Sequence, residues 1–135
     1  MHVTTKYFGN KRFQSNEGPA TITMDAPKEA GGLGEGVGPK SLLLYGLMGC
    51  TGLDVVSILE KKKIDYDSFE ISVDAEQTGT HPKVYKQIKL TFTFETDEAH
   101  RKDIERAITL SEKTFCGVSA MLSKTADMSW ELVIK

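Results

Sequence analysis

Apolar and polar residues alternate along three stretches in the second half of the chain. Residues 69–73 carry an apolar side chain at every second position, residues 88–94 repeat the pattern over a longer run, and residues 128–134 show it again at the end. A period of two predicts strands of a sheet with one face on a core and the other in water. We expect these strands to form antiparallel pairs.

Shorter strand signals occupy the first 25 residues. Residues 3–8, 12–15 and 21–24 are rich in β-branched and aromatic side chains, and glycine-containing turn sequences at residues 9–11 and 16–19 separate them. The sequence therefore predicts three N-terminal strands within residues 1–25.

A long apolar run follows a glycine-rich loop at residues 26–38. Pro39 suits the first turn of a helix, and the helical pattern continues to about Lys63. Residues 42–53 are apolar on nearly every helical face, which predicts burial on all sides. The charge-free stretch at residues 41–53 is too short for a bilayer, which needs about 20 residues, so we expect a core helix.

Two more helices are predicted near the C-terminus. Residues 98–113 show a one-sided apolar pattern, Cys116 and its neighbours interrupt it, and residues 118–124 form a shorter helix. The order βββ-α-ββ-α-β predicts one α+β domain over residues 1–135, with a helix-sheet core in residues 39–135. One sheet cannot cover the first helix on all sides, so we expect a homodimer.

Composition and charge exclude several classes of protein. Apolar residues make up 39% of the chain and charged residues 27%, enough for a packed core. The net charge is −2, without the basic excess that nucleic acids or anionic membranes attract, so we expect neither as a partner. The N-terminal residues lack the apolar segment of a signal peptide, which predicts a cytoplasmic location.

The two cysteines, Cys50 and Cys116, form no CxxC motif, and the three histidines lie far from both in sequence. Standard zinc-ligand spacing is therefore absent, and we expect no metal. In a reducing compartment such a pair is more often redox-active, metal-binding or inert than a structural disulfide.

The glycines allow two interpretations. The loop resembles a phosphate-binding loop only superficially, because Pro39 stands where the required glycine would be, so a flexible cover or a hinge is favoured. Gly46, Gly49 and Gly52 recur every three residues in the long helix, although each glycine costs about 1 kcal/mol there relative to alanine. This repeat predicts close packing against the second helix, beside Cys50.

The local settings of the cysteines differ. Cys116 stands just before a short helix, whose N–H groups favour a thiolate, and Phe115 and Met121 are expected to supply apolar surroundings. Cys50 lies in an apolar helix, where burial raises the pKa of a thiol and an inert core cysteine is the simple alternative. Its activation would need a cation from elsewhere, and Arg12 is the candidate.

Two segments resemble a known family. LLLYGLMGCTGLDVVSIL at residues 42–59 and FCGVSAML at residues 115–122 are similar to the OsmC/Ohr family, the osmotically inducible and organic hydroperoxide resistance proteins, in a less characterised branch. The resemblance implies an intertwined α+β homodimer with two central helices and active sites at the interface. It further implies that Cys50 attacks an organic hydroperoxide and Cys116 resolves the product. We follow this assignment, although local reasoning alone favours Cys116 as the easier thiolate.

The implied chemistry is that of a thiol peroxidase. A sulfenic acid on Cys50 condenses with Cys116 to a disulfide, an external dithiol restores both thiols, and no metal, flavin or haem takes part. Peroxidase members also carry a glutamate directly after the helix-opening proline, whereas Lys40 and Ser41 follow Pro39 here. Glu35 or Glu29 is the available substitute. The alternatives are a non-catalytic protein that binds an apolar ligand at the dimer interface, and a fold with spectator thiols.

Overall fold

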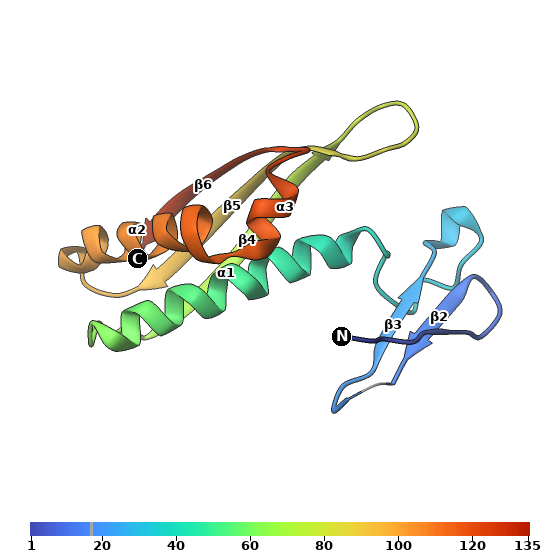
Figure 1. Cartoon of the computed structure of the whole chain (residues 1–135), viewed down its shortest axis with the longest axis horizontal. Helices are drawn as coiled ribbons and strands as arrows, with labels where there is room; N and C mark the ends of the chain where they lie inside the picture. Colours follow the sequence, from blue (N-terminus) through green and yellow to red (C-terminus); the bar gives the residue numbers. More distant parts are fainter. Residues whose placement is uncertain (17) are drawn as a thin grey trace. The chain divides into compact units, whose positions relative to one another are not determined.

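The computed structural model describes residues 1–16 and 18–135, and the described residues form two three-stranded sheets and three α-helices. Glu17, in the turn predicted at residues 16–19, lies outside the described residues. The chain divides into two compact units, Met1–Tyr45 and Gly46–Lys135. The prediction of a single domain stays a prediction. The strands and helices have these bounds, and Figure 1 labels each of them except β1: β1 Lys6–Tyr7, β2 Arg12–Ser15, β3 Ile22–Asp25, α1 Ser41–Lys61, β4 Ser68–Gln77, β5 Tyr85–Glu95, α2 Arg101–Leu110, α3 Gly117–Leu122 and β6 Asp127–Ile134.

The N-terminal unit contains the three predicted strands as an antiparallel sheet in the order β1-β2-β3. The glycine-rich loop folds back on this sheet, and Val37 pairs with Met24 in β3. A Cβ at Gly36 would lie 2.6 Å from the carbonyl oxygen of Thr23, so only glycine permits this approach. The end of the loop is therefore bound to its own sheet, and the expectation of a flexible cover or a hinge stays a prediction.

The C-terminal unit has two layers, with the helices on one face of the sheet β4-β5-β6 (Figure 1). β4 and β5 pair antiparallel as predicted, but β5 and β6 run parallel, so the expectation of purely antiparallel sheets is wrong. The reason is the connection: the chain between β5 and β6 carries α2 and α3, and a helical crossover returns the chain in the same direction.

The apolar face of the sheet forms the core of this unit. Ile88, Leu90, Phe92 and Phe94 in β5 are all nearly or fully buried, as their alternation predicted. The ring of Phe69 in β4 stacks on that of Phe94 with centroids 4.1 Å apart. These contacts fix the sheet on which the helices pack.

The long helix α1 is buried along one stripe only. Leu47, Thr51, Val55 and Leu59 are buried at spacings of four residues, whereas Leu53 is 72% exposed. The predicted burial on all sides is therefore wrong for this chain alone. The physical reason is that one sheet and its crossover helices offer one surface, and a helix turns only one stripe toward it.

The glycines of α1 also differ from expectation. A Cβ added at Gly46 or Gly49 would meet nothing within 4 Å, and one at Gly52 would meet Ile71 in β4 at 3.2 Å. The predicted packing of this glycine repeat against the second helix is wrong within the described chain. Gly52 lies against the sheet instead.

By length and composition, α1 could cross a membrane, with a mean hydropathy of 1.8 over its apolar window. The charge-free stretch at residues 41–53 is the first part of this helix of 21 residues, which also contains Asp54, Glu60 and Lys61. The core helix of a soluble protein can satisfy the same criterion, so the helix by itself identifies neither environment.

The crossover between β5 and β6 changes its helical pitch midway. α2 is preceded by a 3-10 turn at Glu98–His100 and followed by a π-helical turn at Ser111–Phe115, so the helix predicted at residues 98–113 is three segments. The chain then leaves helical geometry at Cys116, with ψ at 106°, and enters α3. This turn sets the position of Cys116.

Candidate functional site

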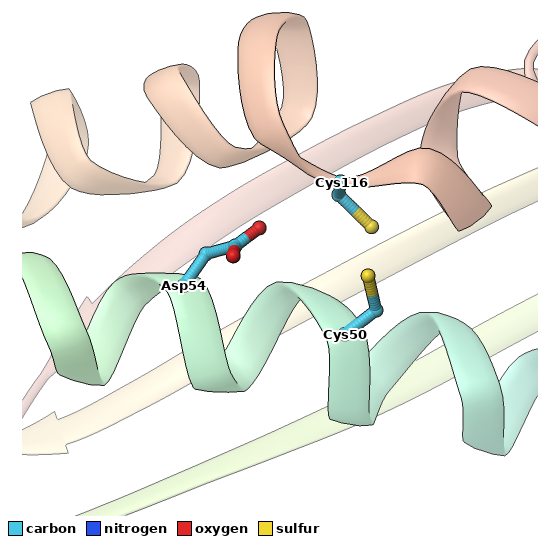
Figure 2. A group of neighbouring side chains, drawn as sticks. All are labelled: Cys50, Asp54 and Cys116. Carbon is cyan, nitrogen blue, oxygen red and sulfur yellow. The ribbon is translucent and has the colours of Figure 1, made fainter.

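Three side chains with metal-ligating or redox chemistry meet between α1 and the start of α3. Cys50 and Asp54 stand four residues apart, on one face of α1, and Cys116 faces them from the end of the π-helical turn (Figure 2). The two sulfurs and a carboxylate oxygen all lie within 4.8 Å of one another. The fold thus brings together two cysteines that are 66 residues apart in sequence, and both thiols are free.

The π-helical turn and α3 together hold Cys116. Its N–H donates to the carbonyl oxygen of Ser111 at 2.7 Å, which closes the wide turn. Its sulfur accepts a hydrogen bond from the N–H of Ser119 at 3.3 Å, so Cys116 is the N-cap of α3. The predicted placement of Cys116 at a helix start is confirmed.

Two buried hydroxyl groups orient the cluster. Thr51 Oγ1 donates to Cys116 Sγ at 3.5 Å, and Ser111 Oγ donates to Asp54 Oδ2 at 2.9 Å. Sequence reasoning missed Asp54, Thr51, Ser111 and Ser119 as site residues. The spacing of Asp54 from Cys50 was a usable signal, because residues four apart share a helix face, but Ser111 and Thr51 reach the site only through the tertiary fold.

The two thiols have opposite pKa shifts. The hydrogen bond to Cys116 raises the pKa of Cys50, and burial and the negative charges of Cys116 and Asp54 raise it further. Burial acts to raise the pKa of Cys116, but hydrogen bonds from Cys50, the Ser119 N–H and Thr51 outweigh it, and the pKa of Cys116 is lowered. Within this chain Cys116 is therefore the easier thiolate, and Cys50 is the thiol that donates to it.

The two sulfurs also differ in access to solvent. Cys116 is 3% exposed, whereas Cys50 is half-buried. Phe115 and Met121, which were expected to enclose Cys116, are 59% and 66% exposed. The expectation that these two side chains surround Cys116 with apolar groups is therefore wrong within the described chain.

Arg12, the predicted activating residue, lies in β2 in the N-terminal unit. It forms an ion pair with Glu35 at 2.8 Å, and the Glu35 N–H donates to Asp25 Oδ2 at 2.9 Å. Glu29 and Glu35 are the two candidates to replace the glutamate that peroxidase members carry after the helix-opening proline. Glu35 is the one that pairs with Arg12. The role of Arg12 toward Cys50 stays a prediction.

A small cavity lies between the helices and the sheet of the C-terminal unit, next to two residues that contact or flank Cys116, Thr51 and Ser119. This cavity, bordered also by Phe92 and Trp130, among others, has a volume of about 10 Å³. This volume is at the lower limit for one water molecule. An organic ligand therefore has no room there.

The two-layer α+β fold and its paired thiols define a class of small proteins with a candidate redox centre. The family model described as OsmC-like protein matches residues 32–131, and the chain belongs to the OsmC-like family. The resemblance found in the sequence is thereby confirmed.

Individual relatives agree with this assignment. Protein YhfA of Escherichia coli is 31% identical over 97 residues, which cover 70% of this chain and 72% of YhfA. A hypothetical protein from Aquifex aeolicus has a similar crystal structure, with a TM-score of 0.81, 27% identity, and coverage of 99% of this chain and 96% of that one. An organic hydroperoxide resistance protein OsmC from Legionella pneumophila shares the fold, with a TM-score of 0.72, 16% identity, and coverage of 98% and 97%.

Proposed function

We propose that the protein is a cysteine-based thiol peroxidase that reduces organic hydroperoxides. The observation that carries this proposal is the meeting of two free thiols, one partly accessible and the other hydrogen-bonded as a helix cap. Family membership supports it, because the fold is shared with a protein described as an organic hydroperoxide resistance protein.

The reaction proceeds in two balanced steps. The sulfur of Cys50 attacks the terminal oxygen of the hydroperoxide and the O–O bond breaks. Cys50 sulfenic acid forms, and the remaining alkoxide takes up a proton and leaves as an alcohol. The Cys116 thiolate then attacks the Cys50 sulfur, the S–O bond breaks as the disulfide forms, and the departing hydroxide takes a proton from solvent and leaves as water. An external dithiol then reduces this disulfide and is itself oxidised to a disulfide.

Access and acidity together favour these roles. Cys50 is the sulfur that a substrate can reach, whereas Cys116 is almost completely buried. The hydrogen bond between them gives Cys116 a second use, because its thiolate can accept the Cys50 proton as Cys50 attacks and pass it to the departing alkoxide, so that Cys116 is again a thiolate for the second step. The lowered pKa of Cys116 also suits the resolving step, which requires a thiolate.

A cation would further activate Cys50, and Arg12 is our candidate. Its pairing with Glu35 would restrict the guanidinium to few orientations, as a positioned activating group requires. We infer that Arg12 acts at a site completed by a homodimer, with Cys50, Cys116 and Arg12 as the catalytic set.

A homodimer also accounts for the exposed apolar surface around the site. Leu53, Phe115 and Met121 are each more than half exposed, and Gly46 and Gly49 leave open space beside α1. A second copy that covers this face would create the apolar pocket that the 10 Å³ cavity does not provide. Such a pocket would favour alkyl hydroperoxides over hydrogen peroxide, because burying a hydrocarbon tail contributes about 25 cal/mol per Å². A cytoplasmic location would keep both thiols reduced.

The direct test adds cumene hydroperoxide to the reduced, chelator-treated protein and follows free thiols over time. We expect rapid loss of both thiols, alcohol formation in proportion, and a disulfide between Cys50 and Cys116. Cys50→Ser is expected to abolish the reaction. Cys116→Ser is expected to leave the first step intact, so that the sulfenic acid on Cys50 accumulates. A dimedone adduct detects this sulfenic acid.

Other results would change the conclusion. Oxidation no faster than that of a free thiol supports the alternative of a non-catalytic protein that binds an apolar ligand. If Cys116→Ser blocks the first step and Cys50→Ser does not, the roles are reversed. For the activating group, Arg12→Lys and Glu35→Gln are expected to slow the first step, whereas Lys6→Gln, a change on neighbouring β1, serves as the control.

A further inference from the structure

The side chains at the paired thiols also match the ligand set of a soft metal ion. Cys50, Asp54 and Cys116 offer two sulfurs and one carboxylate oxygen, all within 4.8 Å of one another (Figure 2). In a tetrahedral Zn²⁺ site with Zn–S bonds of about 2.3 Å, neighbouring ligand atoms lie roughly 3.5 to 3.8 Å apart. Side-chain adjustments of about an ångström or less would therefore bring these atoms to coordination distance.

Hydrogen bonds from outside the cluster already orient two of the three groups. Ser111, which is fully buried, donates to Asp54 Oδ2, and a carboxylate has a second oxygen free for a metal. The Ser119 N–H and the Thr51 hydroxyl both donate to Cys116 Sγ. Metal-binding carboxylates and thiolates are typically supported by such outer donors, which fix their direction and stabilise their negative charge.

The charges of the cluster also favour a bound cation. A bound metal ion takes both thiols as thiolates and Asp54 as a carboxylate, so its three ligands bring three negative charges within 4.8 Å of one another. Three potential anions this close repel one another unless a cation lies among them. A divalent ion would neutralise most of that charge, and two thiolates select a thiophilic ion over Mg²⁺ or Ca²⁺.

We propose that the reduced protein binds one Zn²⁺-type ion per chain through Cys50 Sγ, Asp54 and Cys116 Sγ, and that this ion reversibly blocks the thiols. Binding converts two thiols to two metal–thiolate bonds and releases their two protons, without any change in oxidation state. Three protein ligands leave the fourth position to water, so the site remains exchangeable. The blocking effect rests on the proposed peroxidase function, whereas the binding does not.

The test titrates the reduced full chain with Co²⁺ under anaerobic conditions, without hydroperoxide. We expect a thiolate-to-cobalt charge-transfer band that saturates at one ion per chain and disappears when Zn²⁺ displaces the cobalt. Cys50→Ser and Cys116→Ser are expected to weaken the band and the binding. Oxidation of the pair to the disulfide is expected to abolish both.

Asp54→Asn separates this site from a simple pair of thiols. It is expected to keep the charge-transfer band but to weaken Zn²⁺ binding by at least about tenfold, and Ser111→Ala is expected to weaken it by about tenfold. Glu60→Gln, at an exposed acid on the same helix, is the matched control and should change nothing. Circular dichroism of each variant shows whether it is folded.

Separate readouts distinguish failure of the two proposals. If the protein binds one Zn²⁺ per chain but has no peroxidase activity, the proposed metal site stands and the proposed function is wrong. The metal site alone is overturned by three results together: the protein is active in chelator, added Zn²⁺ leaves this activity unchanged, and Co²⁺ gives no charge-transfer band. Zn²⁺ affinity that is unchanged in folded Asp54→Asn or Cys50→Ser also overturns it, because the ion would then be bound elsewhere.

Discussion

Cys50 and Cys116 have the same side chain but opposite tendencies to ionise. The sulfur of Cys116 accepts from the Ser119 N–H at the start of α3 and from Thr51, and Cys50 adds a third donor. Cys50 lies beside two potential anions, Cys116 and Asp54. Position relative to donors and charges, rather than burial alone, therefore decides which thiol loses its proton first.

This difference predicts a specific response to Cys50→Ala. In the unmodified protein, we expect the first thiol proton to leave below the ordinary pKa of a cysteine, and to leave from Cys116. Removing the Cys50 donor is expected to raise the pKa of Cys116. Thiolate absorbance in the ultraviolet, followed as a function of pH, measures both values.

The same shifts affect folding stability with opposite signs. The Cys116 contribution is present above the unfolded-state pKa of a thiol and is lost as the pH falls through its lowered folded-state pKa. The Cys50 contribution is present below the unfolded-state pKa and is lost as the pH rises through its raised folded-state pKa. A Cys50→Ala variant whose remaining thiol titrates at the same pH as Cys116 in the unmodified protein would contradict the role of Cys50 as donor.

Among the elements, β5 organises the core, and its alternating pattern predicted which of its side chains are buried. Phe92 is fully buried, and its ring meets Trp130 of β6 edge-on, with centroids 6.3 Å apart. The strand therefore joins β4 and β6 into one apolar surface under the helices. The crossover helices were less predictable, because a π-helical turn has no distinctive sequence pattern.

Phe92→Ala is expected to destabilise the fold by about 3 to 5 kcal/mol, since it removes a fully buried aromatic side chain and leaves a large cavity in the core. Urea unfolding measures this change in the free energy of unfolding. Val133→Ala, at a 38% exposed position of β6, is the control and should cost less than about 1 kcal/mol. Equal losses in the two variants would show that the burial of Phe92 does not stabilise the sheet.

At the scale of the whole molecule, α1 leaves an apolar surface uncovered. Leu53 and the two open glycine positions, Gly46 and Gly49, lie on the same helix, outside its buried stripe. Exposed apolar surface of this kind marks protein–protein contact sites in soluble proteins. This surface supports the proposed homodimer.

Leu53→Glu is therefore expected to convert the homodimer to a monomer, because it places a charge on the apolar surface while leaving the buried stripe of α1 intact. Light scattering coupled to size-exclusion chromatography measures the mass. Glu60→Gln, at the polar end of the helix, should leave the mass of the dimer unchanged. A Leu53→Glu variant with the same mass as the unmodified protein would locate any interface elsewhere.

The sequence by itself determined the strands of the core, the long helix and the family, and it singled out the two cysteines that the fold brings together. Periodicity records which face of an element is apolar, and the segments around Cys50 and Cys116 are specific enough to identify the family. Only the tertiary structure decided that β6 runs parallel to β5 and that Ser111, Thr51 and Asp54 surround the thiols. The reason is that strand direction and hydrogen bonds between distant residues depend on how the crossover returns the chain, which local patterns do not encode.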